Sequence, residues 1–248
     1  MGELWRRVAI YALASLALSG IALFTCVTEL YPGGWGGVLR VWPLVLGIGG
    51  LCAALCVGLG CMLFRSTKSR RELLADALLV MFVQLLVLGS GVVVLVQAAP
   101  IRLVWAIDHF ELVSPMELHQ GGRPYALLEQ WSLAWGGLQL QQLVLPKDAR
   151  LRQDLLFSEI AGQSLTSRQE LHGPYQFQSV IRRAALISDV RSVEAKARLQ
   201  EAIAAQSMCA EHEVAWVPLK SRRGFHTVLL SRNDGRICDV VDIDLWDM

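Results

Sequence analysis

Six cysteines carry the most reactive side chains of this chain, and they fall into two groups. Four lie in apolar segments near the N-terminus, where small buried thiols are expected to be inert: Cys26, Cys52, Cys56 and Cys61. The other two, Cys209 and Cys238, lie in the more polar second half with 28 residues between them. A disulfide between these two would stabilise a domain in an oxidising compartment.

Zinc binding is the alternative use of the same residues. Cys209 and His212 would form one ligand pair, and His226 or Cys238 would have to complete the site. Structural zinc sites need a second closely spaced ligand pair, which this sequence lacks. We therefore favour the disulfide over zinc, and we expect no metal site and no cofactor.

The remaining reactive side chains form no recognisable catalytic pattern. Gly89-Ser90-Gly91 lies in an apolar segment, and no apolar segment holds a histidine that could act as its base. The acidic residues near the C-terminus alternate with apolar ones, as on a half-exposed strand: Asp239, Asp242, Asp244 and Asp247. No glycine-rich motif for phosphate or dinucleotide binding occurs. The sequence therefore predicts no enzymatic activity.

The four N-terminal cysteines and Ser90 lie in three segments with few charged residues. These segments cover about 8–27, 41–64 and 73–98. Each is long enough to cross about 30 Å of hydrocarbon as a helix. The first also fits a cleaved signal peptide, but its apolar run continues past the small residues around Ala17 to Ser19, so we favour an uncleaved span. Residues 1–99 are thus predicted to be a region of three transmembrane helices.

The loop between the second and third segments sets the expected orientation. It holds four positive charges within residues 65–71, whereas the loop 29–40 holds one arginine and one glutamate. The charges are those of Arg65, Lys68, Arg70 and Arg71. Positively charged loops stay in the cytoplasm, so residues 100–248 should lie outside it, in the periplasm of a bacterium.

Small and polar residues inside the segments predict helix contacts. Gly50, Ala54 and Gly58 recur every four residues and therefore share one helix face, where another helix can approach closely. That helix is either another span of this chain, which we favour, or a foreign transmembrane helix. Asp76 lies near the inner end of the third segment, and Gln84, near its middle, should hydrogen-bond another helix. A structural role for both is favoured over binding.

Residues 100–248 have the composition of a globular α+β domain. They carry sixteen Lys and Arg against eighteen Asp and Glu, so nothing there is basic enough to bind nucleic acid. Alternating apolar residues predict a strand over 101–107 that continues, after a kink, over 110–113. Further strands are predicted over 138–145 and 214–217. A hairpin of 227–231 with 236–243 is predicted around Asn233-Asp234-Gly235. Helices are expected at 147–161, 176–187 and 192–206.

The order of these segments resembles the type IV pilin accessory proteins of the TfpX/TfpZ kind. The resemblance is carried by Tyr31-Pro32-Gly33 between two spans, by Asp76 and Gln84 in the third span, and by the run from Ile101 to Val113. It extends through Leu155-Leu156-Phe157, Ala161-Gly162, Pro174-Tyr175, Val217-Pro218-Leu219 and the stretch from Ile243 to Trp246. The chain departs from the family pattern at Leu46 to Leu51, which lacks an Asp and a Gly-Pro pair, and at Ala99-Pro100, where Arg-Pro is common.

The resemblance implies a multi-pass protein of the bacterial inner membrane that assists the assembly or stability of a cognate type IV major pilin. It implies no catalytic residue and no cofactor, and its expected partners are that pilin and the lipid bilayer. Whether the protein forms a homo-oligomer is not decided by the sequence. Two rival hypotheses are a membrane-anchored periplasmic enzyme, either a hydrolase or a thiol oxidoreductase, and a signalling or scaffold subunit. The second would usually need a cytoplasmic output module, for which the sequence leaves little room.

Overall fold

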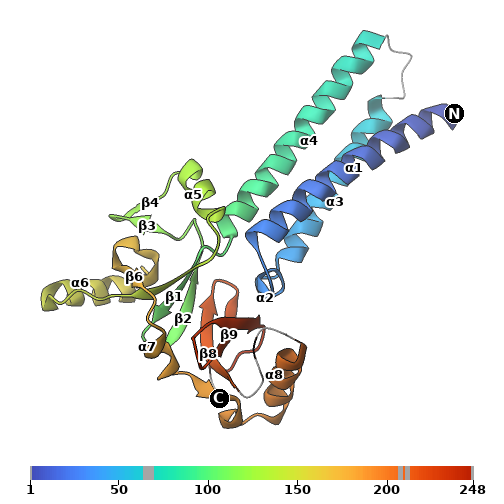
Figure 1. The fold of residues 1–248 in the computed structure, drawn as a ribbon. Helices are drawn as coiled ribbons and strands as arrows, with labels where there is room; N and C mark the ends of the chain where they lie inside the picture. The colour runs from blue at the N-terminus through green and yellow to red at the C-terminus, as the bar shows by residue number, and fades with distance from the viewer. Residues whose placement is uncertain (1, 64–69, 206–208, 210–212, 247–248) are drawn as a thin grey trace. The chain divides into compact units, whose positions relative to one another are not determined.

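The computed structural model describes residues 2–63, 70–205, 209 and 213–246, and they form two compact units. One unit comprises Met1–Glu29 and Arg40–Val96, and the other comprises Leu30–Leu39 and Gln97–Met248. The first is helical, and the second contains a mixed sheet with helices (Figure 1).

Three long helices make up the first unit: α1 (Gly2–Leu30), α3 (Val41–Leu63) and α4 (Arg70–Ala98). Each contains a window long and apolar enough to cross a membrane, at Leu13–Leu30, Val41–Leu59 and Ala75–Ala98. These windows overlap the three segments predicted from the sequence. Hydrocarbon-like side chains on every face are typical of helices that meet lipid or other apolar helices.

The short connection between α1 and α3 belongs to the second unit. It contains α2 (Trp35–Val38), which begins after Gly33 at a φ of +64° and Gly34. A Cβ on Gly34 would lie 3.2 Å from the carbonyl oxygen of Val240, so the absence of a side chain there lets the connection pack against the sheet. This connection was predicted to belong to the transmembrane region of residues 1–99, whereas the structure groups it with the folded domain.

The sheet has the strand order β10-β9-β8-β2-β1-β5-β6, with β7 also pairing with β8. The pairs β1–β5 and β2–β8 are parallel, and the other pairs are antiparallel. In chain order the strands are β1 (Arg102–Ala106), β2 (His109–Val113), β5 (Gln139–Leu143), β6 (His172–Pro174), β7 (Ala185–Leu186), β8 (Val214–Ser221), β9 (Gly224–Ser231) and β10 (Ile237–Val241). All five residues of β1 are buried, which is typical of a strand covered on both faces. A separate small hairpin joins β3 (His119–Gln120) to β4 (Arg123–Pro124).

The predicted continuation of the first strand over 110–113 is wrong. The chain reverses after Ala106, and β2 pairs antiparallel with β1 from Ala106↔His109 to Arg102↔Val113. Ile107 adopts a φ of +68°, and the N–H of Asp108 donates to the carbonyl of Ala106 over 2.8 Å. A branched residue rarely adopts this conformation, so Ile-Asp gave no hairpin signal of the Asn-Gly kind.

The helices of the second unit are α5 (Leu127–Ala134), α6 (Ala149–Ile160), α7 (Phe177–Ile181) and α8 (Val193–Ala205). Asp148 caps α6 by accepting the N–H of Arg150 over 2.8 Å. The helix predicted over 176–187 is too long, because α7 ends at Ile181 and Ala185–Leu186 pairs with β8. Strand pairing overrides helix propensity there, and Trp216 Nε1 reinforces it by donating to the carbonyl of Leu186 over 3.1 Å.

One core cluster joins α8 to the last strands. Leu199 and Ile203 of α8 pack with Leu229 of β9, Cys238 of β10 and Leu245, and each is at most 5% exposed. Burying such side chains contributes roughly 1.5–3 kcal/mol each. This packing fixes the C-terminal segment on the sheet.

Candidate functional site

A line of buried polar and thiol groups links the three long helices. The side-chain amide of Gln84 on α4 donates to Cys56 Sγ on α3, and Cys56 Sγ lies 3.1 Å from Ser15 Oγ on α1. Cys52 and Ser19, one helical turn away, make a second such contact. Gln84 is 7% exposed and both thiols are 1% exposed. The structure thus places Gln84 where it holds helices together, because a buried amide is stable only when its hydrogen bonds are made.

Asp76 lies apart from this line. It precedes Gln84 by eight residues on α4, or about 12 Å along the helix axis. The two polar residues predicted inside the third segment therefore do not form one site. A pocket of about 200 Å³ adjoins Gln84 between α1 and α4, and its lining includes Ser15, Ser19 and Leu88.

The expectation that the small-residue stripe packs against another span of this chain is wrong for the described structure. Gly50, Ala54 and Gly58 are exposed, and a Cβ on Gly50 or Gly58 would meet no atom within 4 Å. The face that α3 turns inward carries Cys52 and Cys56 instead. These thiols are small enough for close approach and also bond to α1 and α4, which the glycines cannot do.

Gly91 is the small residue that allows a close contact between α3 and α4. In the sequence it was considered only as part of Gly89-Ser90-Gly91. A Cβ on Gly91 of α4 would lie 2.8 Å from Ile48 Cγ2 of α3, closer than atoms can approach without a shift. Spacing alone gave no reason to prefer Gly91 over the longer stripe on α3. The choice depends on which helix faces meet, and spacing within one helix does not reveal that.

The second unit has a pocket of about 420 Å³, lined by both polar and apolar residues, beside β2 and the segment 162–168. At its base Glu111 accepts hydrogen bonds from Thr166 Oγ1 over 2.6 Å and from Ser164 Oγ over 3.1 Å. Lys220 Nζ lies 3.4 Å from the other oxygen of Glu111. A carboxylate already engaged by two hydroxyls and an ammonium group is better suited to shaping a binding pocket than to accepting a proton.

A buried arginine lies behind this pocket. Arg102 of β1 is 6% exposed, and its Nη1 donates to His172 Nδ1 over 2.8 Å, while His172 Nε2 donates to the carbonyl of Thr166 over 2.7 Å. Burial lowers the pKa of His172, and the charge of Arg102 lowers it further; the Thr166 bond and Glu170 oppose this. Neutral His172 therefore connects the central strand to the pocket wall.

Ser221, His226 and Asp242 form the arrangement that most resembles a catalytic triad. His226 Nε2 lies 3.0 Å from Ser221 Oγ, and His226 Nδ1 lies 2.9 Å from Asp242 Oδ1. A serine, a histidine base and an orienting carboxylate in this order can activate a hydroxyl nucleophile. Ser221 Oγ also accepts the N–H of Arg223 over 3.0 Å and donates to the carbonyl of Gly224 over 3.2 Å, so it closes the β8–β9 turn as well. Sequence reasoning missed the set because no local motif joins it.

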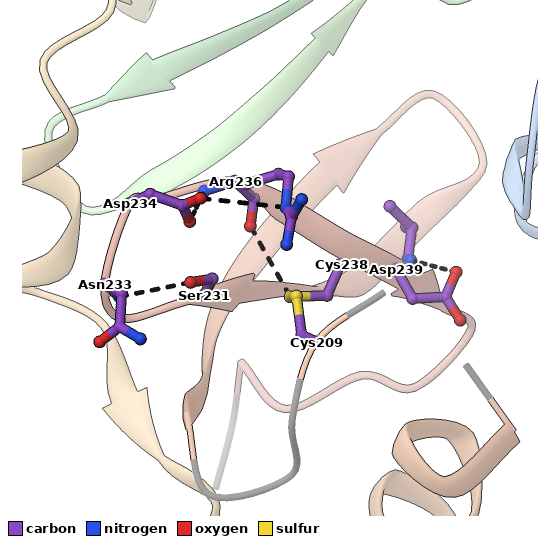
Figure 2. The surroundings of a disulfide bond; sticks show 8 residues. Cys209, Ser231, Asn233, Asp234, Arg236, Cys238 and Asp239 are labelled. Atoms are coloured by element: carbon purple, nitrogen blue, oxygen red, sulfur yellow. Dashed lines mark hydrogen bonds and ion pairs between the residues drawn. A yellow bond between two sulfur atoms is a disulfide. The ribbon is translucent and has the colours of Figure 1, made fainter. Parts of the chain in front are cut away.

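The structure joins Cys209 to Cys238 by a disulfide (Figure 2). The Cα atoms lie 5.7 Å apart, a usual separation for a bridge. The bond ties the segment after α8 to β10, just beyond the Asn233-Asp234-Gly235 turn. Hydrogen bonds from Ser231 and from the N–H of Arg236 lower the pKa of Asp234, and they order this turn.

The described residues contain no group of three or more His, Cys, Asp or Glu that could hold a metal ion. Arg65 and Lys68 of the basic loop lie outside the described residues, Arg70 begins α4, and Arg71 is exposed. The orientation predicted from these charges therefore stays a prediction.

Comparison with known proteins finds a similarity over nearly the whole chain. The chain is 25% identical over 238 residues to the fimbrial assembly protein, serogroup E1, of Dichelobacter nodosus, and the alignment covers 94% of this chain and 91% of that protein. No protein-family model matches the chain. No solved structure matches it.

Proposed function

We propose that this chain is a non-enzymatic protein of the bacterial inner membrane that assists assembly or stability of a cognate type IV major pilin. In this proposal α1, α3 and α4 span the membrane, the loop 64–69 faces the cytoplasm, and the sheet domain lies in the periplasm. The observation that carries it is the end-to-end similarity to a protein named for fimbrial assembly. Because that similarity spans both the helical unit and the domain, it supports a shared architecture and a pilus-related role.

The contacts available on this chain suit a non-covalent helper. The helical unit offers the exposed small-residue face of α3, and the domain offers the pocket around Glu111. Residues 100–248 are nearly neutral, so recognition of a pilin should depend on shape and hydrogen bonds more than on long-range charge. We therefore assign specificity for one pilin mainly to residues 100–248.

Deletion of the gene tests the proposal. Surface pili built from the cognate pilin should decrease, while an unrelated pilin expressed in the same cells should still assemble. Re-expression of the full chain should restore the pili. Unchanged piliation and twitching motility after deletion, with the cognate pilin present, would contradict the accessory role.

Exchange of domains tests where specificity lies. A chimera that joins residues 1–99 of this chain to the matching domain of a related protein should favour the pilin of that relative. The reciprocal chimera is the control, since it should keep the preference for the original pilin. A preference that follows residues 1–99 would place recognition in the helices.

A serine hydrolase is the second candidate function, and the line Ser221–His226–Asp242 favours it. An activated serine should react with a fluorophosphonate probe, and Ser221→Ala should abolish the labelling. Ser231→Ala, at a buried serine that contacts a different turn, is the control and should leave the labelling intact. If the wild-type chain takes up no probe while Ser221→Ala leaves piliation unchanged, the three residues serve only to hold the turn.

A further inference from the structure

Helix α5 presents an apolar face that the described part of the chain leaves uncovered. Leu127, Leu128, Trp131 and Trp135 are 60%, 87%, 40% and 45% exposed. At 3.6 residues per turn these four positions fall within an arc of about 100°. The ring centroids of the two tryptophans lie 6.5 Å apart. A face this apolar on an eight-residue helix calls for a partner.

The neighbouring arc of α5 is fastened to the end of the third apolar helix. Gln130, 7% exposed, accepts a hydrogen bond from Gln97 Nε2 over 3.2 Å and donates to the carbonyl of Tyr125 over 2.8 Å. Gln97 belongs to the same compact unit as α5, and it is the last residue but one of α4, whose apolar window ends at Ala98. The exposed tryptophans therefore lie close to the residue at which the chain leaves the apolar segment.

The β8–β9 turn approaches the same place. The N–H of Met116 donates to the carbonyl of Gln97 over 3.4 Å, and Arg222 Nη1 lies 2.7 Å from Met116 Sδ. Burial raises the pKa of Tyr31, the first residue after α1, and the charge of Arg223 opposes that rise. The domain surface next to two chain exits thus carries aromatic side chains and two arginines, of which Arg222 also pairs with Glu117 over 3.2 Å.

We infer that α5 lies in the membrane–water interface, with its leucines at the acyl chains and Trp131 and Trp135 at the level of the lipid headgroups. Tryptophan is enriched at that depth because its ring is apolar and its N–H is polar. Apolar faces of surface helices bind bilayers in this way, and nearby arginines interact with lipid phosphates. The inference rests on the membrane insertion proposed above and is independent of the pilus role. Its consequence is that the domain is held against the bilayer at a second point besides the helix ends.

Quenching by brominated lipid tests the inference on the full chain in lipid nanodiscs. The signal of the two tryptophans is the fluorescence lost in the double variant Trp131→Phe/Trp135→Phe. This difference signal should lose most of its intensity when the lipid carries bromine near the headgroup end of the acyl chains. Trp42→Phe supplies the control for insertion, since Trp42 is 49% exposed near the start of α3. Trp216→Phe supplies the control for the domain, because Trp216 bonds to Leu186 within the sheet.

The quenching pattern shows whether lipid, water or protein lies against the apolar face of α5. Quenching of the Trp42 signal without quenching of the Trp131 and Trp135 signal would overturn the inference while leaving membrane insertion intact. Quenching of the Trp131 and Trp135 signal by aqueous iodide, without quenching by brominated lipid, would place α5 in water. Protection from both quenchers would show that protein covers the face. A Trp42 signal that bromine does not reach would instead count against membrane insertion.

Discussion

His172 joins a buried arginine to the wall of the domain pocket, and its lowered pKa makes this contact sensitive to acid. The unfolded chain takes up a proton near pH 6.5, whereas the folded chain resists protonation to a lower pH. Between these two values the unfolded state binds more protons. Stability is therefore complete above about pH 6.5 and is lost as the pH falls through this window.

We expect the thermal midpoint of the detergent-solubilised chain to decrease between pH 7.5 and pH 5. At pH 7.5 the thermal midpoint of His172→Gln should be lower than that of the wild type, because the bond to Arg102 is altered. Between pH 7.5 and pH 5 it should decrease less than the wild-type midpoint. His119→Gln is the matched control and should keep the wild-type pH response. If wild type and His172→Gln respond identically to pH, His172 does not carry the acid sensitivity.

Some contacts of single residues could be predicted from the sequence, and others could not. That Gln84 needs a hydrogen-bond partner on another helix follows from the cost of a bare amide in hydrocarbon, and its contact with Cys56 agrees with this. That the partner is a thiol could not be foreseen. Ser221 and His226 come together through the pairing of β8 with β9, and Asp242 joins them through the pairing of β10 with β9; no local pattern encodes both.

Among the helices, Gly91 and Gly50 provide a matched pair of substitutions. Gly91→Leu puts a side chain where Ile48 already lies, so it should destabilise the helical unit by about 1–3 kcal/mol. Gly50→Leu enters open space and should change stability by less than about 0.5 kcal/mol. Thermal unfolding of the two variants measures the difference. Equal destabilisation by both would show that the exposed face of α3 is covered in the isolated chain.

The same pair separates folding from partner binding. If the α3 face meets a pilin helix, Gly50→Leu and Gly58→Leu should reduce the number of pili at an unchanged level of this protein. Immunoblotting for the protein and counting of pili provide the two readings. Normal pilus numbers in both variants would show that the face contacts only lipid.

At the C-terminal end, the disulfide connects Cys209 to Cys238 of β10 and closes a loop with 28 residues between the two cysteines. The chain-entropy model gives such a crosslink roughly 3–4 kcal/mol. Cys209→Ser/Cys238→Ala should lower stability by about that amount, and reduction should lower the wild type equally. Maleimide labelling of the denatured chain checks the bond: reduction should add two labels to the wild type and none to the double variant. Two extra labels on the unreduced wild type would reject the disulfide.

The elements themselves were predictable to different degrees. The helix over 147–161 was foreseen because Gly162 marks its end, and α6 ends two residues before it, at Ile160. The β1–β2 hairpin was missed because its turn uses Ile107 where glycine or asparagine is usual. The small strand Ala185–Leu186 was taken for helix because only its pairing with β8 makes it a strand.

For the whole molecule, the division into an apolar part and a globular domain follows from composition alone, since the charges concentrate after residue 100. The α+β character of the domain was predicted from its residue patterns. The assignment of Leu30–Leu39 to the domain could not be predicted. It depends on Gly34 packing against the backbone of β10, a contact between segments about 200 residues apart.

Orientation is the property of the whole molecule on which the pilus proposal depends most. Four positive charges over residues 65–71, against one arginine and one glutamate over 29–40, should keep the 65–71 loop in the cytoplasm. Alkaline phosphatase is active only outside the cytoplasm, so a fusion after Met248 should be active and a fusion at Ser69 inactive. Green fluorescent protein provides the reciprocal control, because it should fluoresce at Ser69 and not after Met248. Replacing Arg65, Lys68, Arg70 and Arg71 by asparagine should weaken this preference and give a mixed orientation. The opposite pattern in the unaltered chain would place the sheet domain in the cytoplasm, where it could not meet the periplasmic part of a pilin and where the Cys209–Cys238 disulfide would not persist.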